Sequence, residues 1–172
     1  NNFYEYQLFC KSINASIQGF GKDARKAINK ISTKKTFHDI ENNSNIKRRD
    51  DYIFSIDGNN TQDFDDAFSV NIKDDITILS IYITNVAIWM DMTNLWSSFS
   101  ERISSIYLPD RKRPMLPTIL SNILCSLYKG QDRIALAMDI YLKDNNIEKV
   151  EYNNCIINVS ENFCYDEIDN KN

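Results

Sequence analysis

The chain of 172 residues has a formal net charge of −4 and 42% hydrophobic residues, a composition typical of one globular domain and not of a disordered chain. No stretch approaches the roughly 18 consecutive apolar residues that a membrane span needs, so we expect no transmembrane segment. The sequence begins at Asn1 without a charged-then-apolar signal segment, and we expect an excerpt of a longer, intracellular protein.

The cysteines exclude a common class of structural metal site. Cys10, Cys125, Cys155 and Cys164 are far apart in the sequence and form no CxxC pair, and His38 is the single histidine. A structural zinc site needs clustered cysteine and histidine ligands. We therefore expect reduced cysteines and no zinc.

Apolar periodicity predicts the elements in chain order. Residues 22–32 are predicted to form an amphipathic helix, and the polar stretch 41–47 a surface loop. Three strands follow at 52–57, 67–73 and 76–84, with a hairpin turn at Asp74-Asp75. Helices are predicted at 94–105 and, between Pro117 and Gly130, at 117–128. Strands at 134–142 and 147–159 form a last hairpin. The predicted fold is mixed α/β (α+β), a mixed sheet flanked by helices.

The segment Phe54-Ser-Ile-Asp57-Gly-Asn-Asn-Thr-Gln-Asp63-Phe-Asp65-Asp66-Ala67 places four carboxylates between two apolar strands. Carboxylates that fold close together repel and raise one another's pKa, which costs stability. A divalent cation removes this cost, and hard oxygen ligands suit Mg²⁺ or Mn²⁺. Metal ions in such a site can activate water for phosphodiester hydrolysis.

Other interpretations of the acidic segment are weaker. A calcium loop that starts at Asp57 would have Gln62 where a glycine is needed and Phe68 where a bidentate glutamate is needed. Asp63-Phe-Asp65 at a strand end would also suit an Asp-x-Asp phosphatase. An acidic, solvent-facing turn without chemistry is the simplest alternative.

Charge is unevenly distributed around this cluster. Nine basic and three acidic residues lie between Gly21 and Arg49, and six basic and three acidic residues lie between Ser100 and Arg133. Basic regions beside a carboxylate cluster are expected where a nucleic-acid phosphate is bound. Solvated surface charge explains each region equally well by itself.

Two stretches resemble the ribonuclease II/ribonuclease R (RNB) family. The first is Arg48-Arg49-Asp50 with Phe54-Ser-Ile-Asp57 and Asp63-Phe-Asp65-Asp66-Ala67. The second, longer stretch is Ser105-Ile-Tyr107-Leu-Pro-Asp110-Arg111-Lys-Arg-Pro114-Met-Leu-Pro117 and its continuation to Ala135. The resemblance implies an N-terminal extension at 1–47 and the N-terminal half of an RNB catalytic domain at 48–172.

The resemblance also implies a function, a 3′-to-5′ hydrolytic exoribonuclease that degrades single-stranded RNA and releases 5′-nucleoside monophosphates. Asp57, Asp63 and Asp66 would then bind the metal, and Asp65 would be a further catalytic carboxylate. Tyr107 would stack on the terminal base. Phosphate contacts are expected from Arg102, Arg111 and Arg113. The second half of the domain would come from another chain or a further segment.

This sequence departs from the family pattern His-Ile-Ala-Asp-Val-Ser. It has Tyr82 in place of the histidine and Asn85 in place of the aspartate, a position expected near the metal. These differences favour an alternative hypothesis, a non-catalytic RNB-like subunit that binds RNA within a ribonucleoprotein or degradation complex. The four aspartates favour the enzyme.

Overall fold

The computed structural model describes residues 2–12, 26, 31, 33–43, 45–59, 61, 63–96, 105–107, 112–116 and 119–166. The helices in this part are α1 (Asn2–Ser12), α3 (Thr33–Asn43), α4 (Val86–Thr93) and a π-type helix (Ile119–Cys125). The strands are β1 (Lys47–Arg48), β2 (Phe54–Asp57), β3 (Asp66–Lys73), β4 (Ile76–Thr84), β5 (Ile106–Tyr107), β6 (Lys112–Arg113), β7 (Asp132–Lys143), β8 (Asn146–Asn158) and β9 (Glu161–Cys164). None of the described helices is long and apolar enough to cross a membrane.

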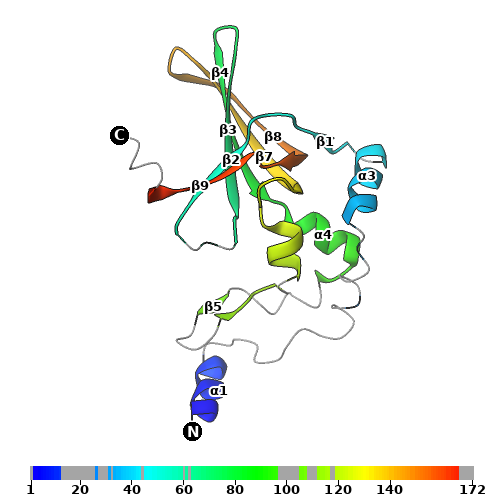
Figure 1. Cartoon of the computed structure of the whole chain (residues 1–172), viewed down its shortest axis with the longest axis vertical. Coiled ribbons are helices and arrows are strands. Elements are labelled where there is room, and N and C mark those ends of the chain that lie inside the picture. Colours follow the sequence, from blue (N-terminus) through cyan, green and yellow to red (C-terminus); the bar gives the residue numbers. More distant parts are fainter. Residues whose placement is uncertain are drawn as a thin grey trace.

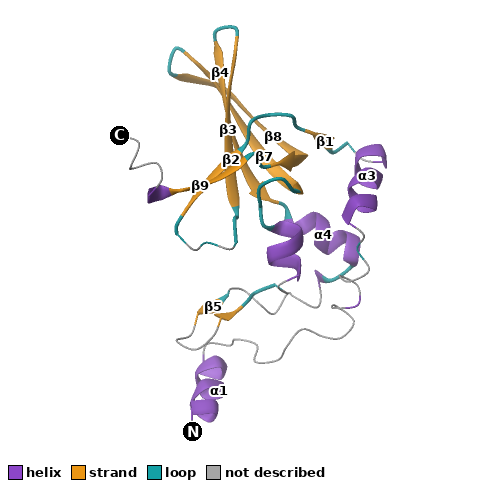
Figure 2. Ribbon diagram, in the orientation of Figure 1, coloured by secondary structure: helices purple, strands orange, loops and turns teal. Residues whose placement is uncertain are grey.

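Within the described residues, the strands form a seven-stranded sheet in the order β1-β8-β7-β4-β3-β2-β9 and a two-stranded sheet of β5 and β6. The large sheet is antiparallel except for the pairs β1–β8 and β2–β9, which are parallel. The helices α3, α4 and the π-type helix lie around one end of the large sheet, and the hairpins β3–β4 and β7–β8 extend away from them at the other end (Figures 1 and 2). The predicted mixed sheet flanked by helices is confirmed.

Both long hairpins form at the predicted turns. Asp74 has a φ of 53°, and Asp144 and Asn145 have φ values of 49° and 63°. Asp and Asn accept this left-handed backbone more readily than other side chains, because their short polar groups bond locally. Two consecutive positive φ values match the right-handed twist of the flanking strands.

The sheet has a hydrophobic core on each face. Trp89 and Met90 of α4 pack over Ile134 and Ile156 on one face, and the ring of Phe37 in α3 meets Trp89 edge-on at 5.9 Å between centroids. The other core contains Ile53, Phe64, Ala67, Tyr82, Leu127, Ala135, Ala137, Cys155, Ile157 and Val159. Successive residues point to opposite faces, so Ile134 and Ala135 belong to different cores.

Several predicted elements need correction. Residues 41–43 continue α3 and are not a loop, because Phe37 and Ile40 bury the face of this helix. The sequence did not predict α4, whose apolar residues follow the β4 strand directly, or the short edge strand β9. In the helix predicted at 94–105, Asn94 ends α4 in a left-handed conformation and Trp96 is helical, while residues 97–104 lie outside the described part. The predicted helix 22–32 also lies outside it, apart from Lys26 and Ile31.

Candidate active site

The ends of β2 and β3 hold two of the four aspartates. Asp57 is the last residue of β2 and Asp66 the first of β3. Burial raises the pKa of the Asp57 carboxyl, and the nearby charge of Asp66 raises it further. The Ser55 hydroxyl donates to Asp57 Oδ2 at 2.7 Å, and this hydrogen bond lowers the pKa. The net shift is upward, which indicates a carboxylate pair in a partly desolvated position.

The other two aspartates flank a residue that is held on both sides. The Phe64 N–H donates to Ser126 Oγ at 3.0 Å, and the Phe64 carbonyl accepts from the Leu127 N–H at 2.8 Å. The Phe64 ring is buried and meets the Tyr128 ring at 5.6 Å between centroids. These contacts attach the acidic loop to the segment after the π-type helix. They fix the backbone from which Asp63 and Asp65 project.

A cavity of about 370 Å³ opens beside this loop. It is lined by Thr61, Asp63, Asp65, Ser105, Tyr107, Pro114, Met115, Leu116 and Ser121. Tyr107 is 74% exposed. The Met115 N–H donates to Ser105 Oγ at 3.0 Å and joins the residue before β5 to the segment after β6. The structure thus brings Asp63, Asp65 and Tyr107, three of the predicted site residues, to one cavity.

The other predicted site residues are not found at this cavity in the described part of the chain. Asp57 and Asp66 are near each other but do not line the cavity. In the described part of the chain, no group of three or more His, Cys, Asp or Glu side chains converges in a way that could hold a metal ion. Arg102 and Arg111 lie outside the described residues, and Arg113 is described only as a backbone position of β6 paired with Ile106.

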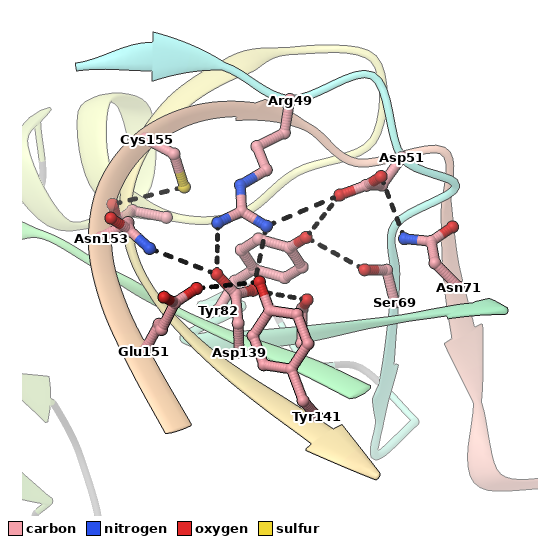
Figure 3. Close-up of polar contacts among 12 residues, drawn as sticks. Arg49, Asp51, Ser69, Asn71, Tyr82, Asp139, Tyr141, Glu151, Asn153 and Cys155 are labelled. Atoms are coloured by element: carbon pink, nitrogen blue, oxygen red, sulfur yellow. Dashed lines mark hydrogen bonds and ion pairs between the residues drawn. The ribbon is translucent and has the colours of Figure 1, made fainter. Parts of the chain in front are cut away.

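Tyr82, at the family's histidine position, belongs to a buried polar network on the sheet (Figure 3). Its hydroxyl donates to Asp51 Oδ2 at 3.0 Å and lies 3.0 Å from Ser69 Oγ. Burial raises the pKa of Tyr82 to about 12, so the hydroxyl remains a proton donor at neutral pH. The Arg49 guanidinium lies 5.9 Å from the centre of the Tyr82 ring.

Arg49 and Asp139 form the centre of this network (Figure 3). Asp139 accepts from Arg49 Nη1 at 2.9 Å, from Arg49 Nη2 at 2.5 Å and from Ser80 Oγ at 2.6 Å. Burial by itself would raise the pKa of Asp139, but the hydrogen bonds from Arg49 and Ser80 outweigh it and the pKa is lowered. Arg48 makes a second bidentate pair with Asp132, at 2.8 and 2.9 Å. Both arginines attach the segment before β2 to β7, a role that the sequence pattern did not reveal.

Asn85 occupies the family's aspartate position and caps α4. Its Oδ1 accepts from the Ile88 N–H at 3.4 Å, and its Nδ2 donates to Asn154 Oδ1 at 2.8 Å. Aspartate and asparagine are equally good N-caps, so the exchange keeps the helix start and removes one negative charge. Asn85 adjoins Thr84, whose N–H donates to the Asp65 carbonyl at 3.1 Å.

The fold and the cavity define an α+β domain with a carboxylate-lined pocket beside an exposed aromatic side chain. Residues 46–171 match the RNB domain, and the chain belongs to this family.

Known relatives are much longer than this chain. It is 33% identical over 170 residues to ribonuclease R of Mycoplasmopsis pulmonis, a match that covers 98% of this chain and 23% of that protein. The apo form of Mycoplasma genitalium RNase R superimposes with a TM-score of 0.76 at 26% identity, covering 92% of this chain and 26% of that one. The same RNase R in complex with double-stranded RNA gives a TM-score of 0.75, again at 26% identity, over 92% of this chain and 29% of that one. Yeast Ssd1, a pseudonuclease, shares the fold alone, with a TM-score of 0.59 at 19% identity over 73% of this chain and 16% of that one. The chain spans about a quarter of the length of the ribonuclease R proteins.

Proposed function

We propose that this chain is the N-terminal half of the catalytic domain of a 3′-to-5′ hydrolytic exoribonuclease that acts on single-stranded RNA. The observation that carries the proposal is the cavity that joins Asp63, Asp65 and Tyr107 in a chain of the RNB family. The products would be 5′-nucleoside monophosphates. A further segment or a second chain would complete the domain, in an intracellular compartment.

Tyr107 and the basic residues would bind the RNA. An exposed aromatic ring stacks on any base, because every base has a π-face, and this suits an enzyme that removes nucleotides whatever their sequence. The RNA phosphates would be contacted by three arginines that are close to Tyr107 in the sequence, Arg102, Arg111 and Arg113. The two backbone hydrogen bonds of Phe64, to Ser126 and from Leu127, form what we call the Phe64 clamp. This clamp would keep the carboxylates of Asp63 and Asp65 opposite the stacked nucleotide.

The proposal includes a requirement for Mg²⁺ or Mn²⁺. Mg²⁺ is usually bound by one or two carboxylates together with substrate phosphates and water, a donor set that the Asp57–Asp66 pair fits. Asp63 would be the third protein ligand, and Asp65 the further acidic residue at the reacting phosphate. When bound, the ion would activate a water and stabilise the departing oxygen.

An RNB-like subunit that binds RNA without cleaving it is the second candidate. Two observations favour it: Asn85 lacks the charge of the family's aspartate, and no three carboxylates of the described residues converge. The likeness in fold to a pseudonuclease is compatible with this candidate.

One assay distinguishes the two candidates. The chain, together with the polypeptide that carries the rest of its RNB domain, is incubated with 5′-labelled single-stranded RNA and Mg²⁺. We expect stepwise shortening from the 3′ end that Asp65→Asn abolishes and EDTA stops. The control Asp75→Asn, in the distant β3–β4 turn, should leave the rate unchanged. RNA binding without shortening, at any Mg²⁺ or Mn²⁺ concentration, would refute the enzyme and support the binding subunit.

A further inference from the structure

One face of the large sheet is mainly apolar and partly exposed, from Ile83 near the end of β4 to the hairpin tips. Residues that pair directly across antiparallel strands share a face. Val70 pairs with Leu79, Leu79 with Ile140, and Ile140 with Val150, so one apolar row crosses β3, β4, β7 and β8. The row on one side is Phe68, Ile81, Met138 and Tyr152, and the row on the other is Ile72, Thr77, Leu142 and Ile147. Exposed members of the apolar sheet face are Val70 (53%), Ile72 (77%), Ile83 (48%), Ile147 (64%), Val150 (40%) and Tyr152 (66%).

Toward the hairpin tips, beyond the second core, the opposite face of the same strands carries polar side chains that are hydrogen-bonded to one another. There Asp139 is 2% exposed and bonded to Arg49 and Ser80, and the Asn71 amide donates to Asp51 Oδ1 at 3.0 Å. An antiparallel sheet with one solvated face normally turns its polar side chains outward. Here the more exposed face is the apolar one. A contiguous exposed apolar face of this kind is a sign of an interaction surface.

Among the residues that the structure describes, helices cover one end of the apolar sheet face. Trp89 and Met90 of α4 pack where Ile134 and Ile156 lie, and the hairpins extend away from these helices (Figure 1). The exposed part begins next to the acidic loop, because Asp66 pairs directly with Ile83 on the same face. A polypeptide seated on this face would therefore border the Asp57–Asp66 pair.

We propose that the apolar sheet face is the docking surface for the remaining portion of the RNB domain, which this chain does not span. The inference rests on the proposed function, in which a further polypeptide completes the site. Relatives that contain this fold are about four times as long, so they have the additional chain that could cover the face.

Site-specific photo-crosslinking in cells of the source organism tests the docking surface. A p-benzoylphenylalanine replaces Tyr152 on the apolar face of β8, and the matched control replaces Lys149 on the opposite face of the same strand. After irradiation, crosslinked peptides are identified by mass spectrometry. We expect the Tyr152 probe to capture a sequence of the RNB family beyond the part matched here, and the Lys149 probe to capture much less of it. Capture of a second copy of this chain, of an unrelated protein or of nothing would overturn the proposal.

A substitution far from the probe checks that the whole face takes part. Ile72→Asp places a charge at a 77% exposed position, so the chain should still fold, which circular dichroism and thermal unfolding verify. Burying an uncompensated carboxylate in an apolar interface is unfavourable, and we expect the crosslink yield at position 152 to fall at least tenfold. An unchanged yield in a folded variant would contradict the proposal. RNA shortening is measured separately: a correct crosslink without shortening refutes only the exoribonuclease, and shortening without the crosslink refutes only the docking surface.

Discussion

Removal of Arg49 tests how the segment before the acidic loop is held. Arg49→Met keeps the length of the aliphatic side chain and leaves Asp139, whose side chain is 3% exposed, without its counter-charge. Loss of one partner of a buried ion pair costs about 3–5 kcal/mol. We expect about 3 kcal/mol by the same principle, because Arg49 is 23% exposed and Ser80 still donates to the carboxylate. Urea denaturation followed by tryptophan fluorescence measures this difference, since Trp89 is buried in the core.

The pH dependence of this difference identifies its cause. The folded pKa of Asp139 lies below the ordinary value of 3.8, so its stabilising effect is complete above that pH and is lost as the pH falls through the folded pKa. In Arg49→Met the carboxyl has no counter-charge, and its pKa should rise above the ordinary value. The gap in unfolding free energy between wild type and variant should therefore be widest near neutral pH and narrow in acid. A gap below about 1 kcal/mol, or one that is the same in acid as at neutral pH, would refute the reasoning. The control Lys149→Met removes an exposed pair with Glu151 and should cost under about 1 kcal/mol.

Two further predictions concern the Phe64 clamp and the four cysteine thiols. Ser126→Ala leaves the buried Phe64 N–H without its acceptor and should lower the free energy of unfolding by about 1–3 kcal/mol. The control Ser12→Ala removes an exposed hydrogen bond to Phe9 and should have little effect. Equal losses of stability in the two variants would contradict the Phe64 clamp. With a thiol reagent at pH 8, Cys164 should react first, because Cys10, Cys125 and Cys155 are buried and burial raises the pKa of Cys125 to about 12 and of Cys155 to about 11. All four thiols should react in urea, and rapid reaction of more than one thiol in the folded protein would contradict the burial of the other three.

Sequence patterns alone predict the strands β2, β3, β4, β7 and β8, both hairpins and the family. Alternating apolar residues between local turn signals are enough for β3, β4, β7 and β8, because strand period and turn chemistry are short-range properties. The sequence also identified Asp63, Asp65 and Tyr107 as members of one site, through two motifs that resemble the RNB family. Their shared cavity agrees with that prediction, while the metal-binding and RNA-binding roles stay predictions.

The contacts that cross the sheet could be found only in the folded structure. The Arg49–Asp139 pair joins residues 90 positions apart, and the Phe64–Ser126 bond joins residues 62 positions apart. Contacts at such separations leave no periodic trace in the sequence, because they depend on strand order. The helix α4 was missed for a related reason, since its apolar residues continue those of β4 and only the Asn85 cap separates the two elements. The exposed apolar face likewise became visible only when the register of four strands placed its residues side by side, and periodicity alone cannot say which face of a sheet is covered.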